Sequence, residues 1–112
     1  MGYKFQPGAD LSGTDFSDLN LRGVNLTGAN LKNAHFRKAN LSGSILSGAN
    51  LTGANFYEAN LTAVDLTNAN LSFANFEGAI LWAADLTGAT LLQAKLIGVH
   101  KDEATKMPDQ VF

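Results

Sequence analysis

The chain has 112 residues, which suits one small domain. Its 8 basic and 10 acidic side chains give a net charge of −2, which is too small to attract nucleic acid or an anionic membrane strongly. It contains no cysteine, which excludes disulfides, thiolate metal sites and thiol catalysis. The first residues lack the basic and apolar regions of a signal peptide, and no apolar run approaches the ~20 residues of a membrane span, so we expect a soluble cytoplasmic protein.

Residues 1–8 precede any regular pattern. They contain the aromatic residues Tyr3 and Phe5 and a turn signal at Pro7–Gly8. A stack of repeats needs its two ends covered. We therefore interpret this segment as an N-terminal cap.

Residues 9–99 repeat every five residues. Each fifth position from Leu11 to Leu96 is Leu or Phe, fourteen and four times respectively. Two places before it, thirteen of the eighteen residues are Ala; one place before, nine are Asn and four are Asp; two places after, nine are Gly. A repeat of this kind must be interpreted before secondary structure, because it decides the fold.

A five-residue apolar period fits neither ordinary element. On a helix each step of five rotates the side chain by ~140°, and on a straight strand an odd period alternates the faces. Either element would leave half of the Leu and Phe side chains in water, at roughly 1.5–3 kcal/mol each. The pattern therefore predicts a chain that turns a corner in every repeat and points all central residues at one axis. Glycine two places after the centre suits such a corner, because it accepts positive φ and close backbone approach.

The four central phenylalanines indicate how many walls one turn has. They are spaced by twenty residues, which is four repeats: Phe16, Phe36, Phe56 and Phe76. A four-sided coil would stack these rings in one column, whereas a three-sided coil would scatter them. The spacing predicts four sides.

The runs ANLTG, ADLTG and ANLSG resemble the pentapeptide repeat proteins, whose repeat is Ala-(Asp/Asn)-Leu-X-X. The match extends from Ala9 to about Val99. The resemblance implies an all-β fold, a right-handed quadrilateral β-helix of about four and a half coils with short terminal caps. Other residues occupy the Asn/Asp position in five repeats, at His35, Ile45, Ile80, Thr90 and Lys95.

Residues 100–112 form the predicted C-terminal cap or tail, because the next central position holds Lys101 and the register stops there. Met107, Val111 and Phe112 could cover the open end of the core. The tail also resembles the Thr-Lys-X-Pro-Asp endings of some family members.

The outward positions offer little chemistry. His35 should stack beside Asp15, with Ser17 on the same wall, but no cleft or oxyanion site accompanies them. The residues show no metal-ligand spacing and no phosphate loop, so we expect no enzyme activity, no metal and no cofactor. A hydroxyl ladder along the fourth wall raises a distant alternative, an ice-binding solenoid: Thr27, Ser47, Thr67 and Thr87.

The segment between Leu41 and Ala94 contains acidic residues but no Lys or Arg. Some pentapeptide repeat proteins resemble duplex DNA in shape and charge and bind DNA gyrase in its place. The resemblance therefore gives an alternative function, a DNA-mimicking inhibitor or protector of gyrase. Its acidic surface would be Glu58, Asp65, Glu77 and Asp85.

Exposed apolar residues in the C-terminal half give the leading hypothesis, because a clustered apolar set suggests an interface. They occupy outward positions: Tyr57, Phe73, Ile80, Trp82, Leu92 and Ile97. We predict a non-enzymatic protein-binding or scaffold solenoid of unknown partner, with no direct nucleic-acid or membrane contact. A homodimer through the C-terminal end is a further candidate, and the tail folding back over these residues is the alternative explanation.

Overall fold

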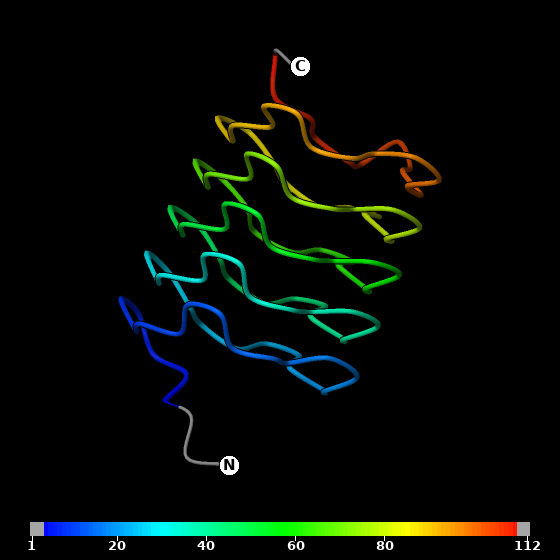
Figure 1. Ribbon diagram of the computed structural model, residues 1–112. Helices are drawn as coiled ribbons and strands as arrows, with labels where there is room; N and C mark the ends of the chain where they lie inside the picture. Colours follow the sequence, from blue (N-terminus) through cyan, green and yellow to red (C-terminus); the bar gives the residue numbers. More distant parts are fainter. Residues whose placement is uncertain (1–3, 110–112) are drawn as a thin grey trace.

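The computed structural model describes residues 4–109 and shows closely similar turns stacked along one axis, with the two ends of the described chain at opposite ends of the stack (Figure 1). Its principal dimensions are 36 × 20 × 19 Å. Within residues 4–109 there is no helix, and the β structure consists of isolated parallel bridges. The fold is therefore a parallel β-solenoid in which each wall contributes a single bridge residue per turn.

The bridges join residues twenty apart along the repeats, from Asp10 with Asn30 to Ile80 with His100. Twenty residues are four repeats, so one turn has four walls, as the phenylalanine spacing predicts. We number the walls by their central residues: wall 1 holds residues 11, 31, 51, 71 and 91, wall 2 holds 16, 36, 56, 76 and 96, wall 3 holds 21, 41, 61 and 81, and wall 4 holds 26, 46, 66 and 86. Wall 1 lies opposite wall 3, and wall 2 lies opposite wall 4.

Each corner is a tight turn that begins at the central residue. In the repeat centred on Leu26, the N–H of Ala29 donates to the carbonyl of Leu26 at 3.0 Å, and Gly28 between them has a φ of 67°. This is the hydrogen bond and the positive φ of a type II turn. All eighteen repeats have positive φ at this position, although only half of them place glycine there.

The prediction that glycine accepts positive φ at the corners is therefore confirmed. The prediction that glycine also allows close backbone approach is wrong at most corners. A Cβ added at Gly13, Gly23 or Gly28 would meet nothing within 4 Å. Glycine is favoured at these corners because it lowers the conformational cost of positive φ, about 1–2 kcal/mol for other residues.

Replacing Ala63 by Gly should stabilise the protein by about 1 kcal/mol, because Ala63 is exposed and has a φ of 57°. Urea unfolding measures the change. Ala69→Gly is the matched control: Ala69 is buried and has no positive φ, so the same substitution should destabilise there. Loss of stability in both variants would contradict the assigned corners.

The Asn or Asp before each centre holds the wall in shape. In all thirteen repeats that have one, its Oδ1 accepts a hydrogen bond from the backbone N–H two residues later. Asn60, for example, accepts from the Thr62 N–H at 3.0 Å and from the Thr62 hydroxyl at 2.6 Å. These are Asx turns, in which the side chain satisfies a donor that the solenoid ladder leaves unpaired.

The core is a single column of inward side chains. Seventeen of the eighteen central Leu and Phe residues are buried, and Leu96 in the last turn is half-buried. The rings of Phe16, Phe36, Phe56 and Phe76 stack with centroids 5.0–5.2 Å apart. The predictions of inward centres and of one phenylalanine column are confirmed.

In the segment predicted as the N-terminal cap, Phe5 is partly buried against the core, and its ring lies 5.9 Å from that of Phe16, the first ring of the column. The Gly8 N–H donates to the Thr27 carbonyl at 2.8 Å and joins the cap to wall 4. Tyr3 lies outside the described residues.

Ser44 occupies one of the small inward positions and is 1% exposed, and its Oγ has no hydrogen-bond partner. Ser44→Ala should therefore stabilise the protein by about 1 kcal/mol, because it removes a buried polar atom that has no partner. Ser42→Ala, two residues earlier and on the outer side of wall 3, is the control and should be neutral or destabilising, since the Ser42 hydroxyl donates to Asn40 Oδ1 at 2.8 Å. Chemical denaturation compares the two, and a destabilised Ser44→Ala variant would contradict the assigned packing.

The C-terminal segment adds a partial layer. After His100 the register gains one residue, so that Asp85 bridges to Lys106 rather than to residue 105. Met107 then packs against the core, as predicted. Val111 and Phe112 lie outside the described residues.

Candidate interaction surfaces

The six apolar residues predicted as an interaction surface do not form one patch. Phe73 and Leu92 lie together at the edge of wall 1, where the Phe73 N–H donates to the Leu92 carbonyl at 2.8 Å. Ile80 and Trp82 flank Leu81 on wall 3, the opposite wall. No single flat partner can cover both pairs.

The other two predicted residues lie on wall 2, two turns apart. Tyr57 is half-buried, and the guanidinium carbon of Arg37 lies 5.3 Å from the centre of its ring. Ile97 is the most exposed large apolar side chain of the described region, at 76%. Tyr57 thus already has a cationic neighbour within its own wall, whereas Ile97 is open to solvent.

Residues 100–109 leave most of the apolar set uncovered. With residues 100–109 in place, Phe73, Trp82 and Leu92 remain 54%, 46% and 45% exposed. Sequence reasoning left out a further exposed apolar residue, Ile45 on wall 4, at 37%. It occupies an Asn/Asp position, and that departure from the repeat was the signal that could have identified it.

The four predicted acidic residues also separate. Glu58 and Glu77 lie at wall 2, joined through a hydrogen bond from the Glu58 N–H to the Glu77 carbonyl at 2.9 Å. Asp65 and Asp85 bridge to each other on wall 4, the opposite side. An acidic rod that resembles duplex DNA needs charge along a continuous face, about one per 1.7 Å of axis. The observed arrangement offers two short, opposed pairs.

Most of these carboxylates already interact within the chain. Glu58 Oε1 lies 4.0 Å from Lys38 Nζ, which is an exposed ion pair. Asp65 and Asp85 each accept hydrogen bonds from the hydroxyl and the N–H of the threonine two residues on. The Thr87 hydroxyl is the main cause of a lowered pKa at Asp85, followed by the Thr87 N–H. These contacts give the aspartates a structural role.

The hydroxyl ladder of wall 4 is present, but three of its four members donate to the Asx oxygen of their own repeat. The distances are 2.6 Å for Thr27, 2.7 Å for Thr67 and 2.6 Å for Thr87. Ser47 follows Ile45 and lacks such an acceptor. Hydroxyls held this way are less available to order water on a flat face.

Asp15 and His35 form a parallel bridge, as predicted. They are not arranged with Ser17 as a catalytic triad, in which the serine hydroxyl would donate to the histidine. Ser17 donates to Asp15 rather than to the histidine: its N–H lies 2.9 Å from Asp15 Oδ1. The Ser17 hydroxyl is the main cause of a lowered pKa at Asp15, with a smaller contribution from His35. The residues lie on an exposed wall. No group of three or more His, Asp or Glu side chains suited to a metal occurs within residues 4–109.

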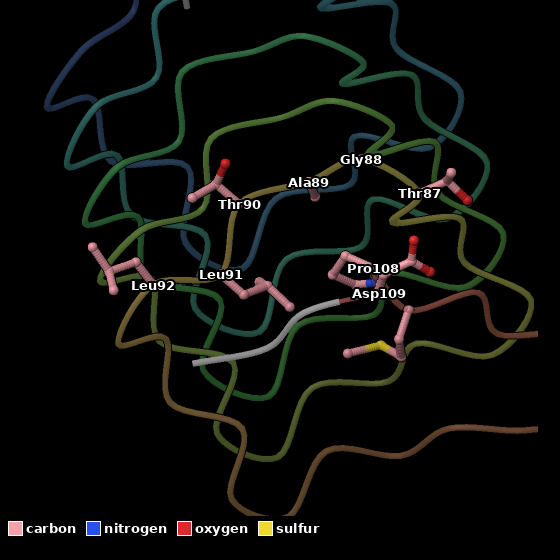
Figure 2. Close-up of a pocket in the computed structure, with 9 residues that line it drawn as sticks. Thr87, Gly88, Ala89, Thr90, Leu91, Leu92, Pro108 and Asp109 are labelled. Carbon is pink, nitrogen blue, oxygen red and sulfur yellow. The ribbon is translucent and has the colours of Figure 1, made fainter.

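The C-terminal end of the described chain carries a concavity. A pocket of about 660 Å³ opens between the last turn and the tail, and Figure 2 shows Leu91 pointing inward, Leu92 pointing outward and Pro108–Asp109 on the other side. Its lining is Thr87, Gly88, Ala89, Thr90, Leu91, Leu92, Met107, Pro108 and Asp109. Sequence reasoning predicted an open end here but not a pocket.

Two tail residues that sequence reasoning did not identify attach this layer to wall 3. Asp102 Oδ1 accepts from the Ala83 N–H at 3.0 Å, and the Thr105 hydroxyl donates to the Leu81 carbonyl at 2.7 Å. Asp102 also accepts from the N–H groups of Ala104 and Thr105. These donors, the Ala83 N–H first, lower the pKa of Asp102. The polar residues Asp102 and Thr105, just past the last regular repeat, were the signal that could have indicated this attachment of the tail.

The fold and its surfaces define a class, the rigid four-walled solenoids built from five-residue repeats. The family model for pentapeptide repeats matches residues 8–43, 34–72, 44–82 and 65–100, and the chain belongs to the pentapeptide repeat family. Proteins of this family fold as right-handed quadrilateral β-helices and are typically non-enzymatic. A comparison with curated protein sequences finds no match. Among residues 4–109 no helix is long and apolar enough to cross a membrane.

Three solved structures illustrate the likeness. HetL from the cyanobacterium Nostoc sp. strain PCC 7120, a protein involved in the regulation of heterocyst differentiation, is 37% identical, with a TM-score of 0.82 over 85% of this chain. The chain spans 46% of the length of HetL. Rfr23 from Cyanothece 51142 is 31% identical, with a TM-score of 0.54, 89% of this chain and 88% of Rfr23 covered. The protein alr5209 from Nostoc PCC 7120 is 28% identical, with a TM-score of 0.53 over 96% of this chain and 93% of that one.

Proposed function

We propose that this chain is a non-enzymatic protein-binding or scaffold module that presents wall 3 to a partner. The observation that carries the proposal is Trp82, 46% exposed on a flat wall, with half-buried Ile80 two residues away. Its neighbour on the preceding turn of the wall is Thr62, and the backbone there is fixed by the Ala63 N–H, which donates to the Trp82 carbonyl at 2.7 Å. An exposed tryptophan is a typical anchor of a protein interface.

The rigidity of the scaffold supports this function. The backbone of wall 3 is hydrogen-bonded to the turns before and after it: the Ile80 N–H donates to the Ala59 carbonyl of the preceding turn at 2.9 Å, and the Leu81 N–H donates to the His100 carbonyl of the following one at 2.7 Å. A side chain on such a wall loses little freedom when it binds, which reduces the entropic cost of association. HetL, which is similar to this chain, is involved in a regulatory process.

The DNA-mimic alternative has less support, because its acidic residues lie on opposite walls and two of them are engaged in Asx turns. A gyrase supercoiling assay tests it directly. We expect unchanged supercoiling when the protein is added, and inhibition would revive the alternative.

Affinity capture from an extract of the source cell tests the proposal, with wild type and Trp82→Ala compared side by side. We expect one or more proteins to be recovered by wild type and reduced at least about tenfold with Trp82→Ala, since interface tryptophans commonly contribute 2 kcal/mol or more. Phe73→Ala is the matched control, because it removes an aromatic side chain of similar exposure, 54%, on the opposite wall 1; it should recover the same proteins as wild type. Equal recovery by wild type and Trp82→Ala would contradict the assignment of wall 3.

A further inference from the structure

Wall 3 differs from the other walls in its charge. Its outward positions, which are the residues just before and after each central residue, contain no carboxylate, whereas each of the other walls has at least one: Asp10, Asp15, Glu77, Asp65 and Asp85. Arg22 is the single charged residue at these positions of wall 3. It is exposed and forms no ion pair within residues 4–109. The nearest carboxylate along the chain, Asp18, lies at the other edge of the wall, at the corner with wall 2.

Arg22 stands beside a shallow hollow in the first two turns of wall 3. The hollow has a volume of about 550 Å³ and is lined by Asn20, Arg22, Gly23, Ser42 and Gly43. The two glycines form the corner with wall 4, and a Cβ added to either would meet nothing within 4 Å. The space beside the guanidinium is therefore open to a group from another molecule.

The asparagines of wall 3 add further hydrogen-bond donors to this face. The Oδ1 atoms of Asn20, Asn40 and Asn60 accept from the N–H two residues later, at 3.2, 3.0 and 3.0 Å. This contact fixes each amide, and no acceptor for its Nδ2 is present within residues 4–109. A guanidinium and a row of fixed amide donors suit the oxygens of a carboxylate.

We propose that wall 3 binds an extended segment of a partner protein that places a carboxylate on Arg22 and an apolar side chain on Trp82. The proposal rests on the use of wall 3 as an interface and names the chemistry of its partner. Trp82 lies three turns from Arg22 in the same outward column, ~14 Å along the axis at ~4.8 Å per turn. In an extended chain residues i and i+4 share one face and lie about 13–14 Å apart, so one segment along the axis reaches both side chains.

The middle of the wall leaves room for such a segment. Ser42 and Thr62 lie between Arg22 and Trp82, and both are half-buried, with hydroxyls that donate to the asparagine of their own repeat at 2.8 and 2.6 Å. A partner helix fits less well, because its same-face residues i+7 and i+11 lie ~10.5 and ~16.5 Å apart along its axis. A nucleic-acid strand is disfavoured, because its phosphates need several cations and wall 3 offers one.

Fluorescence anisotropy with labelled extended peptides tests the recognised chemistry. The peptides carry Asp and Leu four residues apart, Lys and Leu four apart, or Asp and Leu three apart, which places the two side chains on opposite faces. We expect the first peptide to bind at least about tenfold more tightly than either of the others. Equal affinity for the Asp and Lys peptides, or no binding of the first peptide up to about 1 mM, would overturn the proposal.

Charge reversal at Arg22 tests where the carboxylate lies. Arg22→Glu should weaken binding of the first peptide at least about tenfold and strengthen binding of the Lys peptide. Lys32→Glu is the matched control, because it makes the same change of net charge at an exposed position on the opposite wall 1. It should alter both affinities by about twofold or less, and thermal unfolding should show both variants folded. Equal effects of the two variants would mean that net charge alone decides binding and would overturn the contact at Arg22.

Two further results separate this inference from the proposed function. Captured proteins that are lost with Trp82→Ala but retained with Arg22→Glu would overturn the acidic segment and leave wall 3 as the interface. Captured proteins that are retained with both variants would contradict wall 3 itself. A labelled oligothymidylate that binds wild type more tightly than the first peptide, and is released by Arg22→Glu, would identify a nucleic-acid surface and overturn the peptide proposal.

Discussion

Replacing Phe56 by Ala should lower the free energy of unfolding by about 3–5 kcal/mol, enough to unfold a large part of the population of a small domain. Phe56 is fully buried, and its ring stacks on those of Phe36 and Phe76 with centroids 5.1 and 5.0 Å away. The substitution removes one buried aromatic side chain and its contacts with two neighbouring rings, and it leaves a cavity in the middle of the core. Neighbouring turns are fixed by their ladders of hydrogen bonds, so the cavity cannot close.

The stability of this variant is measured by urea unfolding with circular dichroism. Tyr57→Ala is the matched control, because Tyr57 is the next residue and faces outward; it should cost about 1 kcal/mol or less. Comparable losses in both variants would mean that the central residue is not the one that faces the axis.

Replacing Ala54 by Leu should destabilise the protein by about 1–3 kcal/mol, although the substitution increases hydrophobicity. Ala54 is 0% exposed, two residues before Phe56 and in a column with Ala34 and Ala74 that is also fully buried. Three additional carbon atoms must displace stacked rings that are already 5.0–5.2 Å apart. An interior at crystal-like density has no room for them.

Thermal unfolding compares this variant with Thr52→Leu, which introduces the same side chain on the outside of wall 1. The outward change should cost about 1 kcal/mol or less, because it removes only the hydrogen bond from the Thr52 hydroxyl to Asn50 Oδ1. An Ala54→Leu variant as stable as wild type would contradict the close packing inferred for the small inward positions.

The main features of the fold could be predicted from the sequence because a five-residue apolar period has few physical solutions. Inward centres, positive φ at the corners and the phenylalanine column all follow from the spacing. The Asx hydrogen bonds were missed, because Asn and Asp at a fixed position also fit a solvated surface. Positive φ at Lys38, Glu58 and Phe73 could not be expected from residue type alone, since the hydrogen-bonded ladders on both sides impose it.

The candidate surfaces were predicted less well, and the reason is geometric. Whether two outward residues share a wall depends on their separation modulo twenty, and that rule places Trp82 and Leu92 on opposite walls. The same rule pairs Ile80 with Trp82 on one wall and Phe73 with Leu92 on the opposite one, so one flat partner does not cover all six apolar residues. The tail could not be derived, because its one-residue shift depends on two hydrogen bonds to the turn before it: Asp102 accepts from the Ala83 N–H, and the Thr105 hydroxyl donates to the Leu81 carbonyl.

Cysteine pairs introduced on the rod test the four-walled register most directly, because the natural chain has no cysteine to interfere. Residues twenty apart lie on adjacent turns of one wall, at the ~4.8 Å spacing of paired strands, which is within the range that a disulfide bridges. Thr27→Cys/Ser47→Cys should therefore form a disulfide on mild oxidation, whereas Thr27→Cys/Ser42→Cys, fifteen apart on different walls, should keep two free thiols. Bridging of the fifteen-residue pair in preference to the twenty-residue pair would show three repeats per turn and contradict the structure described above.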